Sequence, residues 1–526
     1  MSMTTGSAQY FLVLSETQNK YPVSDLISTA LPPSPPLLIN ENPVTLNSQA
    51  TLTTYTNNDP TSLACLSSTN FTTLQHPLYP YHSIWIKKTT FCNTTVQAYT
   101  GYINISQTRH LFFYFFKSRS DPNRDHIVFW MNGGPGCSSS VGLFMELGPC
   151  RVLDVDGPKY HPESWNTNAN IFFIDHPVGT GFSHGDMIST TEEAALDITA
   201  FISIFFEMFT QFQGRALHMA GESYGGWFLP LFAAAVYDNN ALLWGNGWPP
   251  INLRSVMIGN GLTDSITMIS SYYNMECTPV SIPPTLNIST CITIKSTISR
   301  CEKWMQDACI DVFDSINCGA AYSFCRTAIG TPYARTRMNP YDMSHECDGD
   351  YFETGCYPMM KHISAYLSLP FMRSLLGVDP EVPQDFSSCN SNIITSFHSS
   401  QDELHPTSTK AHLSALLKHD IKVLIYAGAN DWVCNWVGNE WWMLALEWSR
   451  QKEFVWERLR EWYVGGKVAG KTRSAKGLTF ATVDGAGHFV ISYYRGFAIF
   501  FDAFGDCQTC CMSPTMGKIE KVSSIS

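Results

Sequence analysis

Short apolar runs alternate with helical stretches from about residue 80 onward. The clearest strand candidates are residues 126–131, 171–174, 216–219, 256–258, 423–426 and 478–483. A helix is predicted over 192–212, after a capping-box spacing that places Thr190 three positions before Glu193. Alternating strands and helices predict an α/β fold with a mostly parallel central sheet that helices cover on both faces.

Composition divides the chain into five segments. Residues 1–78, rich in Ser, Thr, Asn and Pro, are expected to form a poorly ordered leader or pro-segment. Residues 79–264 and 357–492 carry the alternating pattern, and a cysteine-rich insertion at 265–356 interrupts it. Residues 493–526 form an atypical tail, whose cluster of Cys507, Cys510 and Cys511 is too isolated to predict a metal site.

Charge and hydrophobicity exclude several classes of protein. The 526 residues are 44% hydrophobic, which is enough for a large core. A net charge of −12 disfavours binding to phosphates, so we expect no nucleic-acid partner. No run reaches the ~18–20 apolar residues of a membrane span. The oligomeric state cannot be predicted from these features.

Cysteine usage indicates an oxidising compartment. Eight of the 17 cysteines fall between Cys277 and Cys356, where no C-x2-C pair favours a metal site. Sequons at Asn70, Asn93, Asn104 and Asn287 are glycosylation candidates and agree with a secretory route. No signal peptide is readable, and we expect the true start to be missing. The expected location is the secretory pathway, either extracellular or vacuolar and lysosome-like.

The segment Gly221-Glu-Ser-Tyr-Gly225 matches the nucleophile-elbow pattern G-x-S-x-G. It lies between the strand predicted at 216–219 and a helical stretch at 228–237, the setting that exposes a serine at the carboxyl edge of a sheet. Ser223 is therefore the candidate nucleophile. The alternative is an ordinary surface turn.

A serine nucleophile needs a base that an acid orients. Asp431 follows the strand at 423–426, and His488 follows the strand at 478–483, which matches the order Ser, Asp, His of α/β-hydrolases. Asp484 is a rival acid, but it precedes His488 too closely to approach it from a neighbouring strand.

A glycine-rich turn, Asn132-Gly-Gly-Pro-Gly136, follows the strand at 126–131. The N–H groups of Gly134 and Tyr224 are the expected oxyanion donors. The alternative is a tight bend without a ligand. A phosphate loop is excluded, because the turn has neither the required spacing nor a lysine.

Seven ordered motifs between about residues 85 and 489 together resemble the serine carboxypeptidase family, the carboxypeptidase Y-like enzymes. They are Trp130-Met-Asn-Gly-Gly-Pro-Gly-Cys-Ser-Ser139, Glu146-Leu-Gly-Pro149, Glu163-Ser-Trp-Asn166, Ile174-Asp-His-Pro-Val-Gly-Thr-Gly-Phe-Ser183, Gly221-Glu-Ser-Tyr-Gly-Gly226, Asp431-Trp-Val-Cys-Asn-Trp436 and Gly485-Ala-Gly-His488. The resemblance implies an α/β-hydrolase fold with a disulfide-rich insertion.

The resemblance also implies how a substrate carboxylate is bound. Asn132, Glu146 and Glu222, with Trp130 beside them, match positions that bind the free C-terminal carboxylate of a peptide. Two acidic side chains can do this only when they share protons, which predicts binding at acid pH. From the residues alone, Glu222 would be a structural residue of the elbow and Glu146 a charge on a helix surface.

The resemblance further implies a disulfide connectivity that spacing alone leaves open. The implied pairs are Cys137–Cys389, Cys277–Cys291, Cys301–Cys325, Cys309–Cys318 and Cys347–Cys356. Cys434 is then a free thiol near the leaving-residue pocket, where Phe489 also lies.

Several positions depart from the family pattern. His176 replaces a glutamine, Trp227 and Phe228 replace Arg and Tyr, and Phe489 stands where methionine is common. No proline follows His488, and the amphipathic helix expected behind it is not recognisable. The histidine could therefore be poorly supported.

These features together predict a serine-type carboxypeptidase that acts on peptide or protein C-termini through an acyl-enzyme, with no metal and no organic cofactor. The alternatives are an acyltransferase of the same fold, an esterase or lipase, and a catalytically impaired or non-catalytic binding homologue.

Overall fold

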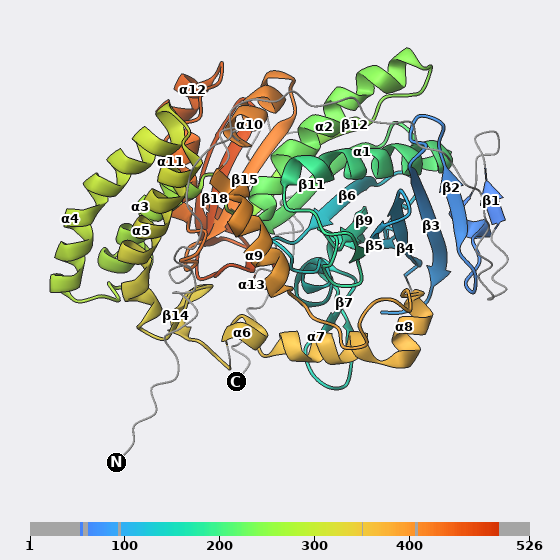
Figure 1. The fold of residues 1–526 in the computed structure, drawn as a ribbon, viewed down its shortest axis with the longest axis horizontal. Coiled ribbons are helices and arrows are strands. Elements are labelled where there is room, and N and C mark those ends of the chain that lie inside the picture. Colours follow the sequence, from blue (N-terminus) through green and yellow to red (C-terminus); the bar gives the residue numbers. More distant parts are fainter. Residues whose placement is uncertain (1–52, 56–61, 93–95, 350, 405–408, 494–526) are drawn as a thin grey trace, which may run out of the picture. The chain divides into compact units, whose positions relative to one another are not determined.

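The computed structural model describes residues 53–55, 62–92, 96–349, 351–404 and 409–493 (Figure 1). Expectations for the chain before residue 53, for Asn93 and for the tail with Cys507, Cys510 and Cys511 lie outside these residues. The described residues belong to one compact unit.

A 14-stranded sheet runs through this unit (Figure 1). Its order is β1 (Thr53–Tyr55), β2 (Thr72–Gln75), β3 (His82–Thr89), β4 (Ala98–Ile105), β5 (Arg109–Phe116), β9 (Ala169–Ile174), β6 (His126–Met131), β11 (Ala216–Ser223), β12 (Asn252–Gly261), β15 (Lys422–Gly428), β18 (Leu478–Val483), β17 (Lys467–Ala475) and β16 (Arg460–Val464), and β10 (His184–Gly185) pairs with β5.

The centre of the sheet is parallel and consists of the six strands that the sequence predicts. Strands β9, β6, β11, β12, β15 and β18 are parallel to their neighbours within this set. Both flanks are antiparallel, from β2 to β5 and from β18 to β16, and were not anticipated. Strand β2 lies within the range 1–78 expected to be a leader, so that boundary is too late: the folded unit begins before residue 79.

Helices lie on both faces of the sheet and in the insertion. The α-helices are α1 (Thr191–Met208), α2 (Gly225–Gly245), α3 (Ser265–Cys277), α4 (Ile288–Met305), α5 (Ser315–Ala334), α6 (Tyr351–Thr354), α7 (Met359–Ser368), α8 (Pro370–Leu376), α9 (Ser391–Ser400), α10 (Thr409–Lys418), α11 (Trp436–Leu444), α12 (Gln451–Trp456) and α13 (Val490–Tyr493). Two further segments, η2 (Gly142–Leu147) and η5 (Gln306–Asp311), are single π-helical turns. The remaining short pieces are the hairpins β7 (Cys150–Val152) with β8 (Pro158–Tyr160) and β13 (Met338–Asn339) with β14 (Asp342–Glu346), and the 3-10 turns η1 (Leu63–Cys65), η3 (Trp165–Thr167), η4 (Thr210–Phe212) and η6 (Asp402–Leu404). No helix among the described residues combines the length and the apolar character that crossing a membrane requires.

Side chains that alternate along the strands separate two hydrophobic cores. On β5, Phe113 and Phe115 pack into the core that α1, α2 and α10 cover. Their neighbours Phe112, Tyr114 and Phe116 pack into the core that η2, α7 and α8 cover. The strand is apolar on both faces because helices cover both sides of the sheet, as the sequence predicts.

The start of α1 differs from the expected capping box. Thr190 is the N-cap residue, but its side chain makes no capping hydrogen bond. Asp402, from the 3-10 turn η6, takes this role instead: one carboxylate oxygen accepts from Thr191 N at 2.9 Å and the other from Thr191 Oγ1 at 2.6 Å. A tertiary contact has replaced the local cap.

The structure contains six disulfides among the described residues. Five are the pairs that the resemblance implies: Cys137–Cys389, Cys277–Cys291, Cys301–Cys325, Cys309–Cys318 and Cys347–Cys356. The sixth, Cys92–Cys150, was not anticipated. Three of them link α3, α4, η5 and α5 within the insertion.

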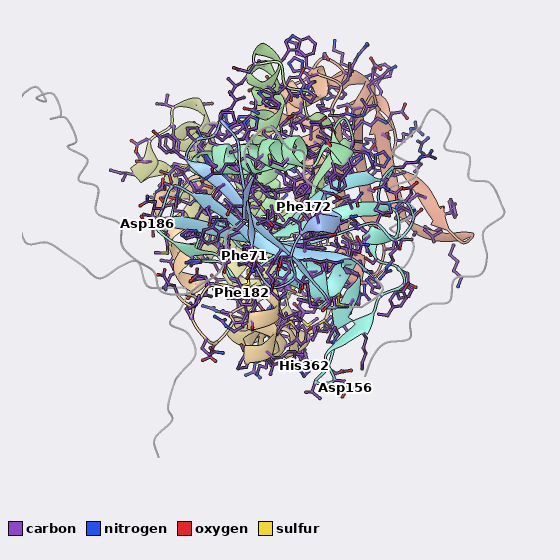
Figure 2. All side chains as sticks on the ribbon, turned by 90° about the vertical axis from the view of Figure 1, so that its right-hand side faces the viewer. Phe71, Asp156, Phe172, Phe182, Asp186 and His362 are labelled. Atoms are coloured by element: carbon purple, nitrogen blue, oxygen red, sulfur yellow. A yellow bond between two sulfur atoms is a disulfide. The ribbon has the colours of Figure 1, made fainter. Side chains whose placement is uncertain are left out.

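Phe172 on β9 should be one of the costliest core residues to truncate. Its ring packs at 4.3 Å from Phe115, 4.7 Å from Phe205 and 5.3 Å from Phe201, and only 3% of its surface is exposed. Phe172→Ala should lower the free energy of unfolding in urea by about 3–5 kcal/mol, since it removes buried surface and leaves a cavity. Exposed Asp186, labelled at the left side of the molecule in Figure 2, provides the control: Asp186→Asn should change the free energy of unfolding by less than about 0.5 kcal/mol. Equal effects of the two changes would contradict this prediction.

Candidate active site

Ser223 ends β11 in a strained conformation. Its φ of +59° lies in the left-handed region, which residues with a Cβ rarely adopt, and α2 begins two residues later at Gly225. A Cβ on Gly221 would overlap the carbonyl of Met131, and one on Gly133 would overlap the backbone N of Tyr224. Strand β6 and its following turn therefore approach the elbow so closely that both positions require glycine.

Asp431 and His488 meet beside this turn. Asp431 follows β15 and His488 follows β18, so both lie at the same carboxyl edge of the sheet as Ser223. His488 Nδ1 donates to Asp431 Oδ2 at 2.8 Å, and the two side chains are only 2% and 0% exposed. The rival acid, Asp484, is exposed and has no such contact.

Asn260 is a functional candidate that the sequence analysis missed. Its side-chain amide donates to Asp431 Oδ2 at 2.7 Å, and its carbonyl oxygen accepts from Gly428 N at 3.0 Å. The backbone N–H groups of Val433 and Cys434 also donate to Asp431. A polar residue between two glycines at the end of β12 was the available signal.

Packing behind His488 differs from the family pattern yet holds the residue. The backbone N of His488 donates to the carbonyl of Tyr341 at 2.7 Å, and the two rings lie 5.1 Å apart. The short helix α13 follows at once, and Val490 is buried in the same core as η2. Ser492 Oγ donates to the carbonyl of Met145, which ties α13 to η2.

Asp431, Cys434 and His488 could in principle hold a metal ion, because their ligand atoms lie within 4.8 Å of one another. However, Asp431 Oδ2 already accepts from His488, Asn260 and Cys434. Burial and the charge of Asp431 raise the pKa of the Cys434 thiol, and a hydrogen bond from Ser223 opposes that rise. A neutral thiol and an occupied carboxylate favour a hydrogen-bonded triad over metal ligation.

A second group that could hold a cation, His184, Asp379 and Glu381, lies apart from Ser223, on β10 and on the loop after α8. His184 Nε2 is 3.8 Å from Asp379 Oδ2, the spacing of a simple ion pair. No cofactor site follows from it.

The expected oxyanion turn lies against the elbow. Asn132 N donates to Ser139 Oγ at 3.1 Å, and Cys137 N donates to the carbonyl of Gly133 at 3.0 Å. Gly134 has φ +117°, a conformation that favours glycine. The disulfide Cys137–Cys389 anchors the end of this turn.

A buried acidic pair adjoins the nucleophile. Trp130 Nε1 donates to Asn132 Oδ1 at 2.8 Å, and Asn132 Nδ2 donates to Glu222 Oε1 at 2.7 Å. Glu146 lies in the π-helical turn η2, is 0% exposed, and is close enough to Glu222 for its charge to act on that carboxyl group, while neither of its own carboxyl oxygens has a hydrogen-bond partner among the described residues. The surface-charge alternative for Glu146 is therefore wrong.

Both glutamates favour their protonated forms. Burial raises the pKa of Glu146 to about 8. Burial and the neighbouring Glu146 raise the pKa of Glu222 well above its ordinary value. Two buried carboxyl groups this close to one another cannot both carry a charge without a large cost, so their burial and proximity support the shared-proton hypothesis.

The residues that depart from the family pattern lie mostly in the core. Trp227 and Phe228 are 5% and 0% exposed. His176 is 1% exposed, and neither ring nitrogen has a hydrogen-bond partner among the described residues. Burial lowers its pKa to about 3. Phe489 is also mostly buried, with its ring 4.9 Å from that of Tyr357.

The described glycosylation candidates differ in accessibility. Asn70 and Asn287 are exposed, and Asn287 also caps α4. Asn104 is 4% exposed on β4, where it bonds to His110 and Ser83. A glycan does not fit there, so Asn104 is withdrawn as a candidate.

Comparison with known proteins identifies one family. The family model described as serine carboxypeptidase matches residues 89–499. Carboxypeptidase Y homolog A of Talaromyces marneffei is 38% identical over 402 residues, which cover 75% of this chain and 69% of that protein. Carboxypeptidase Y of Candida albicans is 36% identical over 415 residues, covering 78% and 74%.

Two further comparisons support less, one because it covers under half of the relative and the other because the sequence identity is low. Carboxypeptidase Y of Schizosaccharomyces pombe is 38% identical over 425 residues, and the match spans 78% of this chain but only 41% of that protein. The crystal structure of Kex1Δp, a prohormone-processing carboxypeptidase from Saccharomyces cerevisiae, superimposes with a TM-score of 0.65 over 77% of this chain and 91% of that one. At 23% identity this likeness shows a common fold, the α/β-hydrolase fold.

The buried acidic pair should make the protein less stable as the pH rises. A raised carboxyl pKa means that the folded state binds the proton more tightly than the unfolded chain does. The stability that Glu146 contributes is complete below about pH 4.5 and is lost as the pH rises to about 8. We expect the free energy of unfolding, measured from pH 5 to 8, to fall less steeply in Glu146→Gln than in wild type. The difference between the two slopes should be up to about 1.4 kcal/mol per pH unit, the contribution of one titrating proton.

Exposed Glu302 provides the control for this titration, and Glu302→Gln should keep the wild-type slope. Identical slopes for wild type and Glu146→Gln would show that the proton is not held at this pair.

Proposed function

The chain belongs to the serine carboxypeptidase family, and from this premise we propose that it hydrolyses the C-terminal peptide bond of peptides and proteins, most rapidly at acid pH. The observation that carries the proposal is the buried network of Asn132, Glu146 and Glu222 beside Ser223, since an endopeptidase or esterase needs no site for a free carboxylate.

In the proposed reaction, Ser223 Oγ attacks the carbonyl carbon of the last peptide bond while His488 Nε2 takes its proton. Asp431, bonded to Nδ1, fixes the tautomer and stabilises the imidazolium that forms. His488 then gives the proton to the leaving amino group, and the C–N bond breaks. Water, deprotonated by His488, attacks the acyl-enzyme and restores Ser223.

The N–H groups of Gly134 and Tyr224 are proposed to stabilise the negative oxygen of the tetrahedral intermediate. Tyr224 is well fixed for this role. Its phenol donates to Asp402 at 3.0 Å and to Glu403 at 3.3 Å, and its ring is 2% exposed. A fixed side chain limits the movement of the backbone N–H next to Ser223.

Substrate selection is assigned to the acidic pair. A peptide carboxylate can bind Glu222 and Asn132 only while the pair carries protons, because two ionised carboxylates would repel it. With Glu146 at a pKa of about 8 and Glu222 also raised, binding should be complete at acid pH and weaken above neutrality. Cys434 and Phe489 are proposed to lie near the leaving residue.

We also propose that the chain passes through the secretory pathway, to the exterior or to a vacuolar or lysosome-like compartment, with Asn70 and Asn287 as accessible glycan sites. The six disulfides among the described residues support this proposal, because disulfides persist in oxidising compartments. The raised pKa of Glu146 also supports it, because the proposed carboxylate site would then work at the acid pH of such a compartment.

The function is tested by release of leucine from a benzyloxycarbonyl-Phe-Leu peptide between pH 4.5 and 8. Ser223→Ala should lower kcat by about 10⁴-fold or more, since the remaining site can only bind and polarise the substrate. KM should rise towards pH 8 as the acidic pair loses its protons. The amide-blocked peptide should be a poor substrate.

The outcomes separate the alternatives. Equal rates on the free and the amide-blocked peptide would indicate an endopeptidase or esterase. Acyl transfer to an added alcohol with little release into water would indicate a transferase. Binding without turnover by the folded protein would indicate a catalytically impaired homologue.

A second experiment distinguishes Asp431 from its sequence rival. Asp431→Asn should reduce kcat by about 10⁴-fold with little change in KM, because the amide no longer stabilises the productive tautomer or the imidazolium. Asp484→Asn, at an exposed position only four residues before His488, should retain wild-type rates. Comparable losses in both variants would contradict the assignment of Asp431.

A further inference from the structure

One face of α5 lies between two segments that contact the residues around Ser223. A Cβ on Gly319 would overlap the side chain of Gln401, two residues before Glu403. A Cβ on Gly330 would lie 3.3 Å from the ring of Trp432, the residue after Asp431. Both glycines therefore mark the face of α5 that is directed towards the site.

Arg326 lies on this same face. At 100° per residue, positions 319, 326 and 330 fall within about 40° of one another around the helix axis. Arg326 follows Cys325, which is buried in one hydrophobic cluster with Cys434 and Leu404. Its side chain therefore projects between the segment with Glu403 and the segment with Trp432.

Both of these segments contact the nucleophile region directly. Glu403 accepts from the phenol of Tyr224, the residue after Ser223, at 3.3 Å. Tyr272 stacks on Trp432 at 4.3 Å and donates to the carbonyl of Val433 at 3.0 Å. Arg326 interacts electrostatically with Tyr272 and Glu403, so its charge acts on the wall formed by these two segments, which adjoin Ser223 and Asp431.

The charge of Arg326 is available to a ligand. Arg326 is an exposed residue, and it forms no ion pair with any side chain that the structure describes. Burial by surrounding protein lowers its pKa, but Tyr322, Tyr272 and Glu403 raise it by more, so it stays cationic.

The nearby carboxylates are already engaged. Glu403 is 4% exposed and bonds to His398 at 2.7 Å as well as to Tyr224. Asp402 is 4% exposed and bonds to Thr191 and Tyr224. The charge that this wall presents to a substrate is therefore the positive charge of Arg326.

We propose that Arg326 is a specificity-determining residue that favours substrates with an acidic side chain on the acyl side of the scissile bond, that is, a glutamate or aspartate next to the C-terminal residue. The acyl side is assigned because Glu403, which interacts with Arg326, accepts from Tyr224, the proposed oxyanion donor, whereas the proposed site for the leaving residue's carboxylate is formed by Glu222 and Asn132. This inference rests on the proposed function.

The experiment compares kcat/KM for four blocked dipeptides, benzyloxycarbonyl-Glu-Leu, -Gln-Leu, -Lys-Leu and -Phe-Leu, at pH 6, where a glutamate side chain is ionised. Wild type should favour Glu over Gln by about 10-fold, and Lys should be the poorest of the three polar substrates. Arg326→Gln should abolish the Glu preference and leave Phe-Leu hydrolysis within about 2-fold. Arg326→Glu should reverse the order of Glu and Lys.

Arg300 on α4 provides a matched control. It is exposed, and its guanidinium lies over the rings of Trp304 and Phe324, on another face of the insertion. Arg300→Gln should keep the wild-type preference.

Equal rates on Glu-Leu and Gln-Leu in wild type, with Phe-Leu cleaved, would overturn the role of Arg326 alone. Two other results would also overturn it. One is a preference for Glu-Leu over Gln-Leu that persists in Arg326→Gln. The other is a preference for an acidic side chain only in the leaving residue, seen with benzyloxycarbonyl-Leu-Glu against benzyloxycarbonyl-Leu-Gln. Failure to cleave Phe-Leu at all would instead contradict the proposed function.

Discussion

The close approach of three strands at Ser223 is the constraint on which the rest of the site depends. A residue with a Cβ at φ +59° is strained, and such strain persists only where the surroundings hold it. Here the turn after β6 touches Tyr224 N through Gly133, and Leu262 N, just past β12, donates to the carbonyl of Ser223 at 2.9 Å. The elbow is therefore held from both sides by its neighbours in the sheet, and β15 and β18 bring Asp431 and His488 to the same edge.

Burial of carboxyl groups beside this turn gives the site its chemical character. Three carboxyl groups, Asp431, Glu222 and Glu146, lie close together with almost no solvent, but their surroundings differ. Asp431 accepts four hydrogen bonds, from His488, Asn260, Val433 and Cys434. Glu222 has one donor in Asn132 and a second acid beside it, which favours the proton. One region thus places an acid that is bonded to a histidine beside a pair of acids that favour their protons, and we propose that the first orients a base while the pair receives the anion of a substrate.

The sequence predicted the parts of the fold that local patterns encode. The parallel strands β6, β9, β11, β12, β15 and β18 stand out as short apolar runs between helices, and the elbow and its partners follow from where these strands end. The antiparallel flanks were missed because strands such as β3 mix polar and apolar residues without a clear period. Asn260, Asp402 and Glu403 were missed for another reason: each acts on a residue more than 150 positions away, and no local pattern reports such a contact. The same holds for the cap of α1, where Asp402 supplies what Thr190 was expected to supply.

His176 and Phe228, which both depart from the family pattern, contact one another in the structure. The family pattern places a glutamine and a tyrosine there, two groups that need hydrogen bonds when buried. In this chain the ring of His176 packs edge-on against Phe228 at 4.8 Å and Phe232 at 5.3 Å. With a pKa of about 3 the imidazole is neutral, so it is buried without the cost of a charge. The joint change replaces a polar contact with aromatic packing, although neither ring nitrogen of His176 has a hydrogen-bond partner among the described residues, a cost that this packing has to offset. Since Phe228 is in the first turn of α2, the helix that follows Ser223, this packing is part of the support behind the elbow.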